Sequence, residues 1–371
     1  MCKLLLINSL GFGGAEKVFV GLVNRLDSED LGSDVKICSI LNKSDYKVSS
    51  NININFLSKK KRLNPLLLPF YLFKFLSLCL KLRPSLVQSH LFWSNYINII
   101  CSFFCNYDAQ VVHCVSFDSK FKKGATRFFH FVLSRILFNK ASLNIFKSYE
   151  MRDEYVSNFN IDISKTVVIY NPVSLKVIKS KTLNVSKMKD TINIALVGRF
   201  HRSKRYLDLL DIAKSLRVNA CFHCIGEGEQ MPLIQQKVQE GGLHDAFRFY
   251  GWMENPSTVL DECDIYLSCS ESEGFPNALI EAMSRGLIPI HSNCKTGPRE
   301  ILGETRVSEN GYDLREAGIT FPVGDICAAA RAIENIACNK VDSKFILNNS
   351  ISRANGLSEH DSYEDYIELL K

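Results

Sequence analysis

Short apolar runs alternate with longer amphipathic stretches along the whole chain. The runs have the length of buried strands, and the stretches repeat apolar residues at the helical period. In the first half the pattern predicts strands at residues 3–8, 35–41, 86–88, 110–115, 142–146 and 167–170, with helices at 15–26, 65–82, 93–104 and 122–139. Strands that alternate with helices favour a parallel sheet covered by helices on both faces.

The alternation is interrupted once. Asn171-Pro172-Val173 breaks the pattern, a polar, lysine-rich stretch follows, and a new series begins with a strand at 192–197. We therefore expect two doubly wound α/β domains, at 1–170 and 191–355, joined by a linker at 171–190. A last helix at about 358–370, in a terminal segment 356–371, would be free to pack back on the first domain.

The length of 371 residues suits two domains of ordinary size. Thirteen cysteines scattered through apolar runs favour reduced core thiols over a disulfide framework. Cys221-Phe222-His223-Cys224 lacks a second ligand pair at zinc-finger spacing and alternates like a strand, so a metal site is the weaker interpretation. The N-terminal apolar run is typical of a first strand rather than a signal peptide, and we expect a cytoplasmic protein.

The net charge of +6 is unevenly distributed. Residues 48–147 hold 14 Lys and Arg against two acidic residues, Asp108 and Asp118. One face of the first domain must then be basic. Its partner should be anionic: a phospholipid surface or a lipid diphosphate, with nucleic acid the less favoured option.

Two basic segments of this half are also apolar. Lys59-Lys60-Lys61-Arg62 precedes an apolar run at 66–80, which at about 15 residues is too short to span a bilayer. Residues 120–147 interleave Lys and Arg with phenylalanines. Both segments suit shallow insertion at an anionic membrane surface. The alternative is a helix packed in the domain with a solvated cationic face.

Glu273 and Glu281 lie eight positions apart around a Gly-Phe-Pro turn that opens a predicted helix. Gly274 lets a ligand approach the backbone, and Pro276 is preset for a first helical turn. The N–H groups that follow Pro276, near Phe275–Asn277, would then point outward. Two separated acceptors that bracket a row of donors suit a sugar. The alternative is a helix N-terminus whose acidic residues are favoured by the dipole.

Strands predicted at 264–269 and 286–291 place this turn at the carboxyl edge of a sheet, where open α/β folds bind ligands. The Glu-(seven residues)-Glu spacing with Gly-Phe-Pro inside it resembles the signature of the retaining glycosyltransferases of family 4. The resemblance implies the GT-B architecture, with two doubly wound Rossmann-like domains facing across a cleft. It implies that Glu273 binds hydroxyls of a donor sugar and that Glu281 binds the ribose of its nucleotide.

Gly198-Arg199 ends the strand at 192–197, and Lys204 follows five residues after Arg199. Ser203 is predicted to cap a helix that has Lys204 in its first turn. Cations there oppose the helix dipole, so a bound diphosphate explains them. In family 4 a Gly-Arg and a Lys at this spacing take the diphosphate of a nucleotide sugar, which gives Arg199, Lys204 and Glu273 catalytic roles. Because the two cations can replace a metal electrostatically, we expect no obligatory metal or other cofactor.

In the first domain, Gly13-Gly14-Ala15-Glu16 resembles the family's first glycine loop, which implies that Gly13 and Gly14 face the donor diphosphate. The loop is not a dinucleotide-binding G-x-G-x-x-G, so a nicotinamide cofactor is not expected. His90 and Ser116, which follow two predicted strands, are the acceptor-side candidates by the same resemblance. His113 is expected to be a buried, hydrogen-bonded histidine.

The resemblance extends over nearly the whole chain. It implies transfer of a hexose or N-acetylhexosamine from a nucleotide-diphosphate sugar, with UDP favoured, to a lipid-linked or oligosaccharide acceptor. The implied setting is bacterial O-antigen or capsule assembly, with the protein peripheral on the inner face of the cytoplasmic membrane. Two other classes stay open: a GT-B-fold sugar-nucleotide epimerase and a non-catalytic lipid-glycan scaffold.

Overall fold

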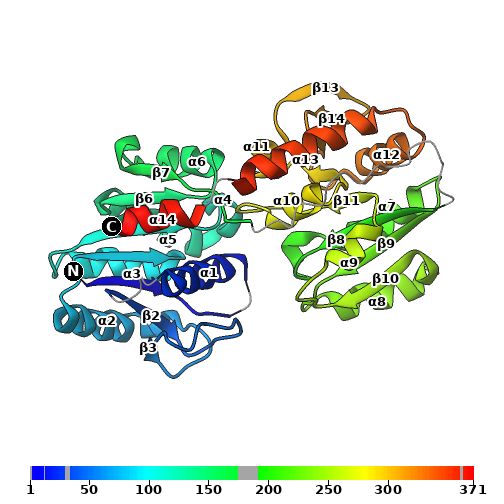
Figure 1. Cartoon of the computed structure of the whole chain (residues 1–371). Helices are drawn as coiled ribbons and strands as arrows, with labels where there is room; N and C mark the ends of the chain where they lie inside the picture. Colours follow the sequence, from blue (N-terminus) through cyan, green and yellow to red (C-terminus); the bar gives the residue numbers. More distant parts are fainter. Residues whose placement is uncertain (1, 12, 30–33, 174–190, 360–361) are drawn as a thin grey trace. The chain divides into compact units, whose positions relative to one another are not determined.

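The computed structural model describes residues 2–11, 13–29, 34–173, 191–359 and 362–371 (Figure 1). It divides the chain into two compact units. Unit 1 is Met1–Pro172 together with Asp361–Lys371, and unit 2 is Val173–His360. Most of the linker predicted at 171–190 lies outside the described residues.

Unit 1 is built on a seven-stranded parallel sheet in the order β3-β2-β1-β4-β5-β6-β7. Its strands are β1 (Lys3–Ile7), β2 (Val35–Leu41), β3 (Ile54–Ser58), β4 (Leu86–His90), β5 (Asp108–His113), β6 (Leu143–Phe146) and β7 (Thr166–Val168). Its α-helices are α1 (Gly14–Ser28), α2 (Leu68–Leu82), α3 (Phe92–Ser102), α4 (Phe117–Lys120), α5 (Gly124–Leu137), α6 (Tyr149–Phe159) and α14 (Ser362–Leu370). Single 3-10 turns are η1 (Pro65–Leu67), η2 (Phe138–Lys140) and η3 (Ile163–Lys165).

The side chains of β1 divide between the two faces of this sheet, because successive residues of a strand point to opposite sides. Leu5 and Ile7 belong to the core that includes residues of α1 and α14. Leu4 and Leu6 belong to the core that includes residues of α2 and α3. The pattern explains why β1 is apolar throughout: a central parallel strand is buried on both faces.

The sequence pattern missed the strand β3 and the helix α6 of unit 1, besides the four-residue helix α4. The edge strand β3 buries little of its surface, so its residues lack the apolar run of a central strand. The helix α6 has a polar sequence and buries only Met151, Tyr155 and Phe159. In both cases the element is stabilised by tertiary packing and not by a hydrophobic pattern in its own sequence.

The helical segment Pro65–Leu82 is 18 residues long, with a mean hydropathy of 1.6, which is long and apolar enough to cross a membrane by those two criteria. By these criteria the prediction that the apolar run at 66–80 is too short to span a bilayer is wrong, because the helical segment also includes Pro65, Lys81 and Leu82. However, Tyr71, Phe75 and Cys79 of α2 belong to the core of unit 1. In this structure α2 lies along the sheet by that stripe.

The terminal helix α14 packs in unit 1, through Tyr366, Ile367 and Leu370. The Gln110 side chain donates a hydrogen bond of 3.1 Å to the carbonyl oxygen of Leu369. Sequence-distant ends of the chain therefore share one core.

Unit 2 has an eight-stranded sheet in the order β10-β9-β8-β11-β12-β15-β14-β13. The strands are β8 (Ile192–Val197), β9 (Ala220–Ile225), β10 (Phe247–Gly251), β11 (Ile265–Ser268), β12 (Ile288–Ser292), β13 (Thr305–Glu309), β14 (Tyr312–Arg315) and β15 (Gly318–Phe321). The pairs from β10 to β15 are parallel, and the hairpin of β13 and β14 extends the sheet antiparallel.

The helices of unit 2 are α7 (Asp208–Ser215), α8 (Met231–Glu240), α9 (Ser257–Glu262), α10 (Asn277–Ser284), α11 (Pro298–Leu302), α12 (Ile326–Ala337) and α13 (Ser343–Glu359), with 3-10 turns η4 (Arg202–Lys204) and η5 (His244–Ala246). They lie between strands, except for α12 and α13, which follow the last strand. Cys221–Cys224 lies within β9, as its alternation predicts, with Cys224 buried.

One buried cation links α14 to the sheet of unit 1. Lys147 directly follows β6 and is almost fully buried. Its ammonium donates a hydrogen bond to the Tyr366 hydroxyl and lies 4.6 Å from the centre of the Tyr366 ring. Burial lowers the pKa of Lys147 to about 8, with the nearby Cys114 acting weakly in the opposite direction. The neighbouring His90 is also buried, and burial lowers its pKa.

We predict that Lys147→Met stabilises the protein at neutral pH by about 3 kcal/mol, because the folded state no longer buries a charge. Between pH of about 8 and the ordinary lysine value of 10.5, the unfolded wild type binds more protons than the folded one. Wild-type stability should therefore rise with pH in this window, and the advantage of the variant should disappear. Urea unfolding at several pH values measures the difference. The exposed Lys140→Met is the matched control, and equal curves for all three proteins would contradict the prediction.

Candidate active site

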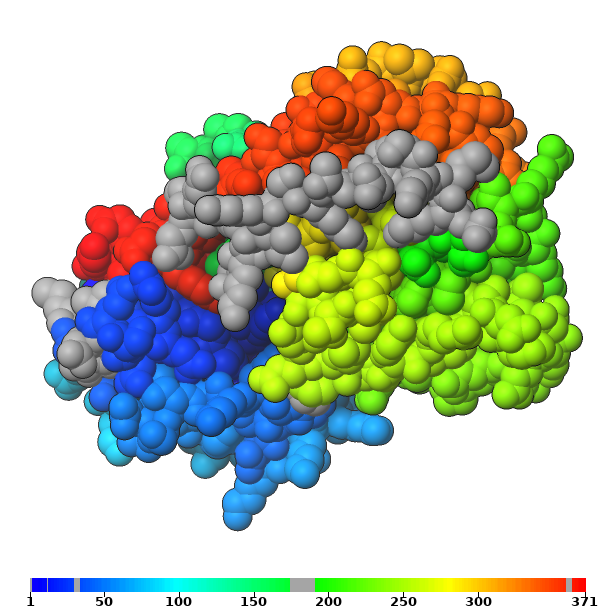
Figure 2. Space-filling view, turned by 45° about the vertical axis from the view of Figure 1, so that its right-hand side comes forward, coloured from blue at the N-terminus to red at the C-terminus, as the bar shows by residue number. Residues whose placement is uncertain are grey.

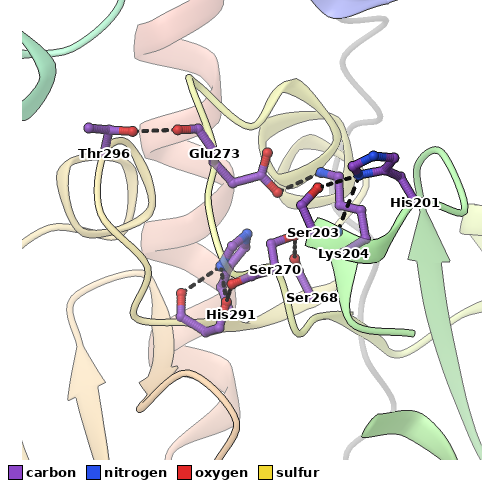
Figure 3. A network of polar contacts seen from close by, with 9 residues as sticks. His201, Ser203, Lys204, Ser268, Ser270, Glu273, His291 and Thr296 are labelled. Carbon is purple, nitrogen blue, oxygen red and sulfur yellow. Dashed lines mark hydrogen bonds and ion pairs between the residues drawn. The ribbon is translucent and has the colours of Figure 1, made fainter. Parts of the chain in front are cut away.

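Three loops of unit 2 meet at the carboxyl ends of β8, β11 and β12, which are neighbours in the sheet. The loops carry Lys204, Glu273 and Thr296 respectively (Figure 3). In the space-filling view the yellow surface of unit 2 lies beside its green surface, which belongs to earlier residues of the same unit (Figure 2). Parallel strands bring their carboxyl ends to one edge, so residues far apart in sequence converge there.

The loop after β8 differs from its prediction. Residues Arg202–Lys204 form a single 3-10 turn, and His201 caps it by accepting a hydrogen bond from the Ser203 N–H. Arg205 is left-handed, with φ of 51°, and α7 begins only at Asp208. The prediction that Ser203 caps an α-helix was therefore wrong. His201 caps the turn instead, and the left-handed Arg205 ends it after a single 3-10 turn.

Lys204 and Glu273 form an ion pair. The Lys204 Nζ donates a hydrogen bond of 2.6 Å to Glu273 Oε1, and the two side chains are 27% and 11% exposed. Burial alone would raise the pKa of the Glu273 carboxyl, but the Lys204 ammonium, aided by the Ser270 hydroxyl, outweighs burial and the pKa lies below its ordinary value. The carboxylate is thus kept charged and available as a hydrogen-bond acceptor.

The backbone around Glu273 is anchored from the loop after β12. The Thr296 hydroxyl donates a hydrogen bond to the carbonyl oxygen of Glu273. Thr296 and Gly297 have φ of 65° and 99°. A Cβ on Gly297 would lie 2.7 Å from Cδ of Pro276, so only glycine fits against this turn. The loop after β11 is also tied to the loop after β8, because the Glu271 N–H donates to the carbonyl oxygen of Ser203 at 2.7 Å.

His291 lies at the end of β12, fully buried near Glu273. Its Nδ1 donates a hydrogen bond of 2.8 Å to the carbonyl oxygen of Ser292. Burial lowers the pKa of His291 to about 4, against the opposing charge of Glu273, so the ring is neutral at neutral pH. Sequence reasoning treated His291 as a strand residue and did not assign it to the site. The sequence did contain an indication: a histidine at the end of the predicted strand 286–291, whose carboxyl end lies at the same edge of the sheet as Glu273.

The second carboxylate lies on α10, as expected. Glu281 is the fifth residue of the helix and is partly buried, and Phe275 and Pro276 are buried in front of it. Pro276 is the residue before the helix rather than its first residue. Gly274 and Asn277 are partly exposed, and Arg199 is exposed directly after β8. All these predicted donor residues therefore belong to the same edge of unit 2.

The remaining predicted residues belong to unit 1. Gly13 precedes α1 in an extended conformation, its carbonyl oxygen accepts from the Tyr46 hydroxyl at 3.2 Å, and Gly14 is the first helical residue. His90 is fully buried at the end of β4, with Nε2 3.3 Å from Oε1 of Gln88. Gly13 and Gly14 thus lie at the start of α1, and their contact with a donor diphosphate stays a prediction.

Ser116 is used structurally. Its hydroxyl caps α4 by accepting from the Ser119 N–H and donates a hydrogen bond of 3.0 Å to Glu154. Ser116 and His90 are both fully buried, so neither offers an exposed group to an acceptor here. His113 is a buried histidine that lies 2.9 Å from the Asn144 side chain, as predicted.

Among the described residues, no three His, Cys, Asp or Glu side chains cluster as metal ligands would.

Comparisons with known proteins agree with the fold and with the motifs. Residues 12–177 match the family model described as Glycosyltransferase Family 4, and residues 191–339 match the model described as Glycosyl transferases group 1. Together the two matches cover most of both units. The resemblance inferred from the sequence is therefore confirmed.

Two curated relatives match most of their length. One, from Campylobacter jejuni, is named N-acetylgalactosamine-N,N'-diacetylbacillosaminyl-diphospho-undecaprenol 4-alpha-N-acetylgalactosaminyltransferase, and is 28% identical over 81% of this chain and 83% of its own. The other is the Staphylococcus aureus capsular polysaccharide biosynthesis glycosyltransferase CapH, 28% identical over 76% of this chain and 79% of its own. Both names describe sugar transfer.

Among solved structures, the apo form of the lipopolysaccharide outer core galactosyltransferase WaaB aligns with a TM-score of 0.73 at 19% identity, covering 100% of this chain and 99% of its own. A sucrose-phosphate synthase from Thermosynechococcus elongatus aligns with a TM-score of 0.81 at 17% identity, covering 100% and 98%. These similarities confirm the predicted GT-B fold class.

We predict that Lys204→Met destabilises the protein at pH 7 by roughly 2 kcal/mol, because it leaves the nearly buried Glu273 carboxylate without its cation. The pKa of Glu273 is lowered in the folded wild type, so this contribution is present above the ordinary carboxyl value and is lost as pH falls through the folded pKa. The difference between variant and wild type should therefore shrink in acid. Urea midpoints at neutral and acidic pH test this, and a difference independent of pH would contradict it.

Proposed function

Because the chain belongs to glycosyltransferase family 4, we propose that it transfers a hexose or N-acetylhexosamine from a nucleoside-diphosphate sugar to a lipid-linked glycan. The chain is a glycosyltransferase of surface-polysaccharide synthesis. The sugar, the nucleotide and the acceptor are parts of the proposal. The observation that carries the donor assignment is the Lys204–Glu273 pair, which puts a cation and a charged acceptor at one sheet edge.

In the proposed donor complex Lys204 and Arg199 neutralise the diphosphate, and Glu273 accepts hydrogen bonds from the sugar hydroxyls. The backbone N–H groups of Phe275 and Asn277, on either side of Pro276 at the start of α10, donate hydrogen bonds to the nucleotide sugar. Glu281 accepts from the ribose. The Lys204–Glu273 ion pair supports these roles, because it places a cation and a charged acceptor side by side at this edge of the sheet.

The proposed transfer retains the anomeric configuration, as the family resemblance implies. The bond between the anomeric carbon and the diphosphate oxygen breaks, and the electron pair leaves with the diphosphate. The acceptor hydroxyl oxygen bonds to the anomeric carbon on the same face, and its proton passes to the departing phosphate oxygen. Lys204 and Arg199 stabilise the charge that develops on the leaving group, which makes an obligatory metal unnecessary.

A lipid-linked acceptor is supported by two observations. The relative from Campylobacter jejuni carries a diphospho-undecaprenol acceptor in its name, and residues 48–147 hold 14 basic against two acidic residues. A polyprenyl diphosphate is anionic and sits in a membrane, so a basic domain suits it. We extend the proposal to a peripheral location on the cytoplasmic face of the membrane.

The epimerase and scaffold alternatives have distinct signatures. An epimerase converts donor alone into a second sugar nucleotide, whereas a transferase needs the acceptor. A scaffold would bind glycan lipid without turnover. Incubation of the protein with donor alone, followed by separation of sugar nucleotides, distinguishes the first alternative.

We predict that one of UDP, GDP and ADP, with UDP expected, raises the melting temperature of the wild type and not that of Lys204→Ala, since binding to the native state stabilises it. Lys237→Ala, which removes an exposed lysine of α8, is the matched control and should keep the shift. A shift retained by Lys204→Ala would overturn the diphosphate assignment, and no shift with any nucleotide would favour the scaffold.

We further predict that Glu281→Ala lowers kcat/KM for the donor by about 100-fold or more while leaving the melting temperature within a few degrees, because the loss is in donor binding and not in the core. Transfer of radiolabelled sugar to a polyprenyl-diphosphate glycan measures it. Addition of EDTA should leave wild-type turnover unchanged. A near-wild-type kcat/KM of the variant would remove Glu281 from the site.

A further inference from the structure

The outward face of α2 is apolar, although it is exposed. Tyr71, Phe75 and Cys79 are the buried stripe of this helix. On the opposite side of α2, and in the turn η1 that leads into it, large apolar side chains recur at helical spacing and are highly exposed: Leu66 of η1 87%, Phe70 43%, Phe73 69% and Leu80 59%. A helix that packs by one stripe on a soluble domain ordinarily has a polar opposite face. This one has a second apolar stripe.

The stripe is bordered by cations. Lys74 and Lys81 are exposed on the same side of α2, and the exposed segment Lys59-Lys60-Lys61-Arg62 precedes the helix. Residues 46–107 hold eight Lys and Arg and no Asp or Glu. Within the part of the chain that the structure describes, none of these cations in or beside the helix forms an ion pair. This surface therefore combines exposed apolar side chains with positive charges that no ion pair among the described residues neutralises.

The helix α5 also has an exposed apolar stripe, and it lies in the same layer of helices as α2. The helices α2 and α3 are in contact, as are α3 and α5 (Figure 1). The helix α5 exposes Phe128, Phe129, Val132 and Ile136, and Lys122, Lys123 and Arg135 are exposed around them. Phe103 and Phe104, exposed at the end of α3, lie in this layer too. The layer thus presents aromatic side chains and cations on one side of the sheet of unit 1.

We propose that α2 is an interfacial helix: its Leu66–Leu80 stripe inserts into an anionic phospholipid leaflet, and its lysines contact the lipid phosphates. The α5 stripe is a secondary contact in the same layer. Four helical turns of a stripe extend over about 20 Å, which suits a helix lying flat with its apolar face about 5–10 Å deep. The partner is a bilayer because the charged residues around the stripe, within residues 46–107, are all cations, which suit the anionic phosphates of lipids. The stripe has no carboxylates beside it in this part of the chain that could pair with a basic protein.

This proposal rests on the proposed function only for the identity of the membrane that holds the acceptor. It predicts that the wild-type protein floats with vesicles of phosphatidylcholine and phosphatidylglycerol and much less with phosphatidylcholine alone. The double variant Phe70→Ser, Phe73→Ser should bind at least tenfold more weakly, and Lys74→Glu, Lys81→Glu should lose the preference for the anionic lipid. Added salt should weaken wild-type binding.

The control is Leu233→Ser, which changes an exposed apolar residue on α8 of unit 2 and should leave vesicle binding unchanged. As a direct depth measurement, Phe73→Trp should be quenched by lipids brominated on the acyl chains, and Leu233→Trp should not. Equal binding by the double serine variant would overturn the proposal. So would a change from oligomer to monomer in that variant, which would identify the face as a contact between two copies of this chain.

The vesicle assay contains no sugar nucleotide or acceptor, so it measures membrane binding whether or not the transferase proposal is correct. The serine variants should keep the nucleotide shift of melting temperature, because α2 belongs to unit 1 and Lys204 to unit 2. Retained nucleotide binding with lost vesicle binding supports the interfacial helix. Lost nucleotide shift in the wild type with intact vesicle binding counts against the transferase proposal alone.

Discussion

The ion pair of Lys204 and Glu273 is the contact around which unit 2 arranges its site, and it depends on the sheet. The two residues are 69 positions apart. They meet because β8 and β11 are neighbouring parallel strands whose carboxyl ends lie at one edge. A carboxylate that is 11% exposed stays charged only with a cation and hydrogen bonds in place. The 3-10 turn that presents Lys204 and the Thr296 hydroxyl that holds the Glu273 backbone both serve this requirement.

The corresponding edge of unit 1 is organised differently. Its first loop starts α1 with two glycines, and the side chains that end β4 and follow β5 are turned into the core. The Ser116 hydroxyl is hydrogen-bonded to Glu154, and His90 Nε2 lies 3.3 Å from Gln88 Oε1, while His90 Nδ1 is buried without a hydrogen-bond partner among the described residues. The charged chemistry of the described residues is therefore concentrated in unit 2, while unit 1 offers backbone groups at α1 and the basic, apolar layer of α2, α3 and α5.

Much of this could be anticipated from the sequence, for a physical reason. Parallel strands are apolar on both faces and stand out as runs, so the alternation of elements and the change near residue 171 were readable. The placement of Glu273 and Glu281 could also be predicted, because it depends on a turn and a helix formed by neighbouring residues. The weakly buried β3, the polar α6 and the η4 turn were missed or misread, because their form is decided by neighbours distant in sequence.

The sequence by itself determined which residues carry the chemistry: the two glutamates, Arg199 and Lys204, and the excess of cations around residues 46–107. Only the tertiary structure decided that Lys204 is paired with Glu273, that His291 lies beside them, and that α2 turns one apolar stripe inward and another outward. Composition records how many apolar and charged groups a segment has. Which of them are buried depends on which strands and helices pack together, and that is settled by long-range contacts that no local pattern encodes.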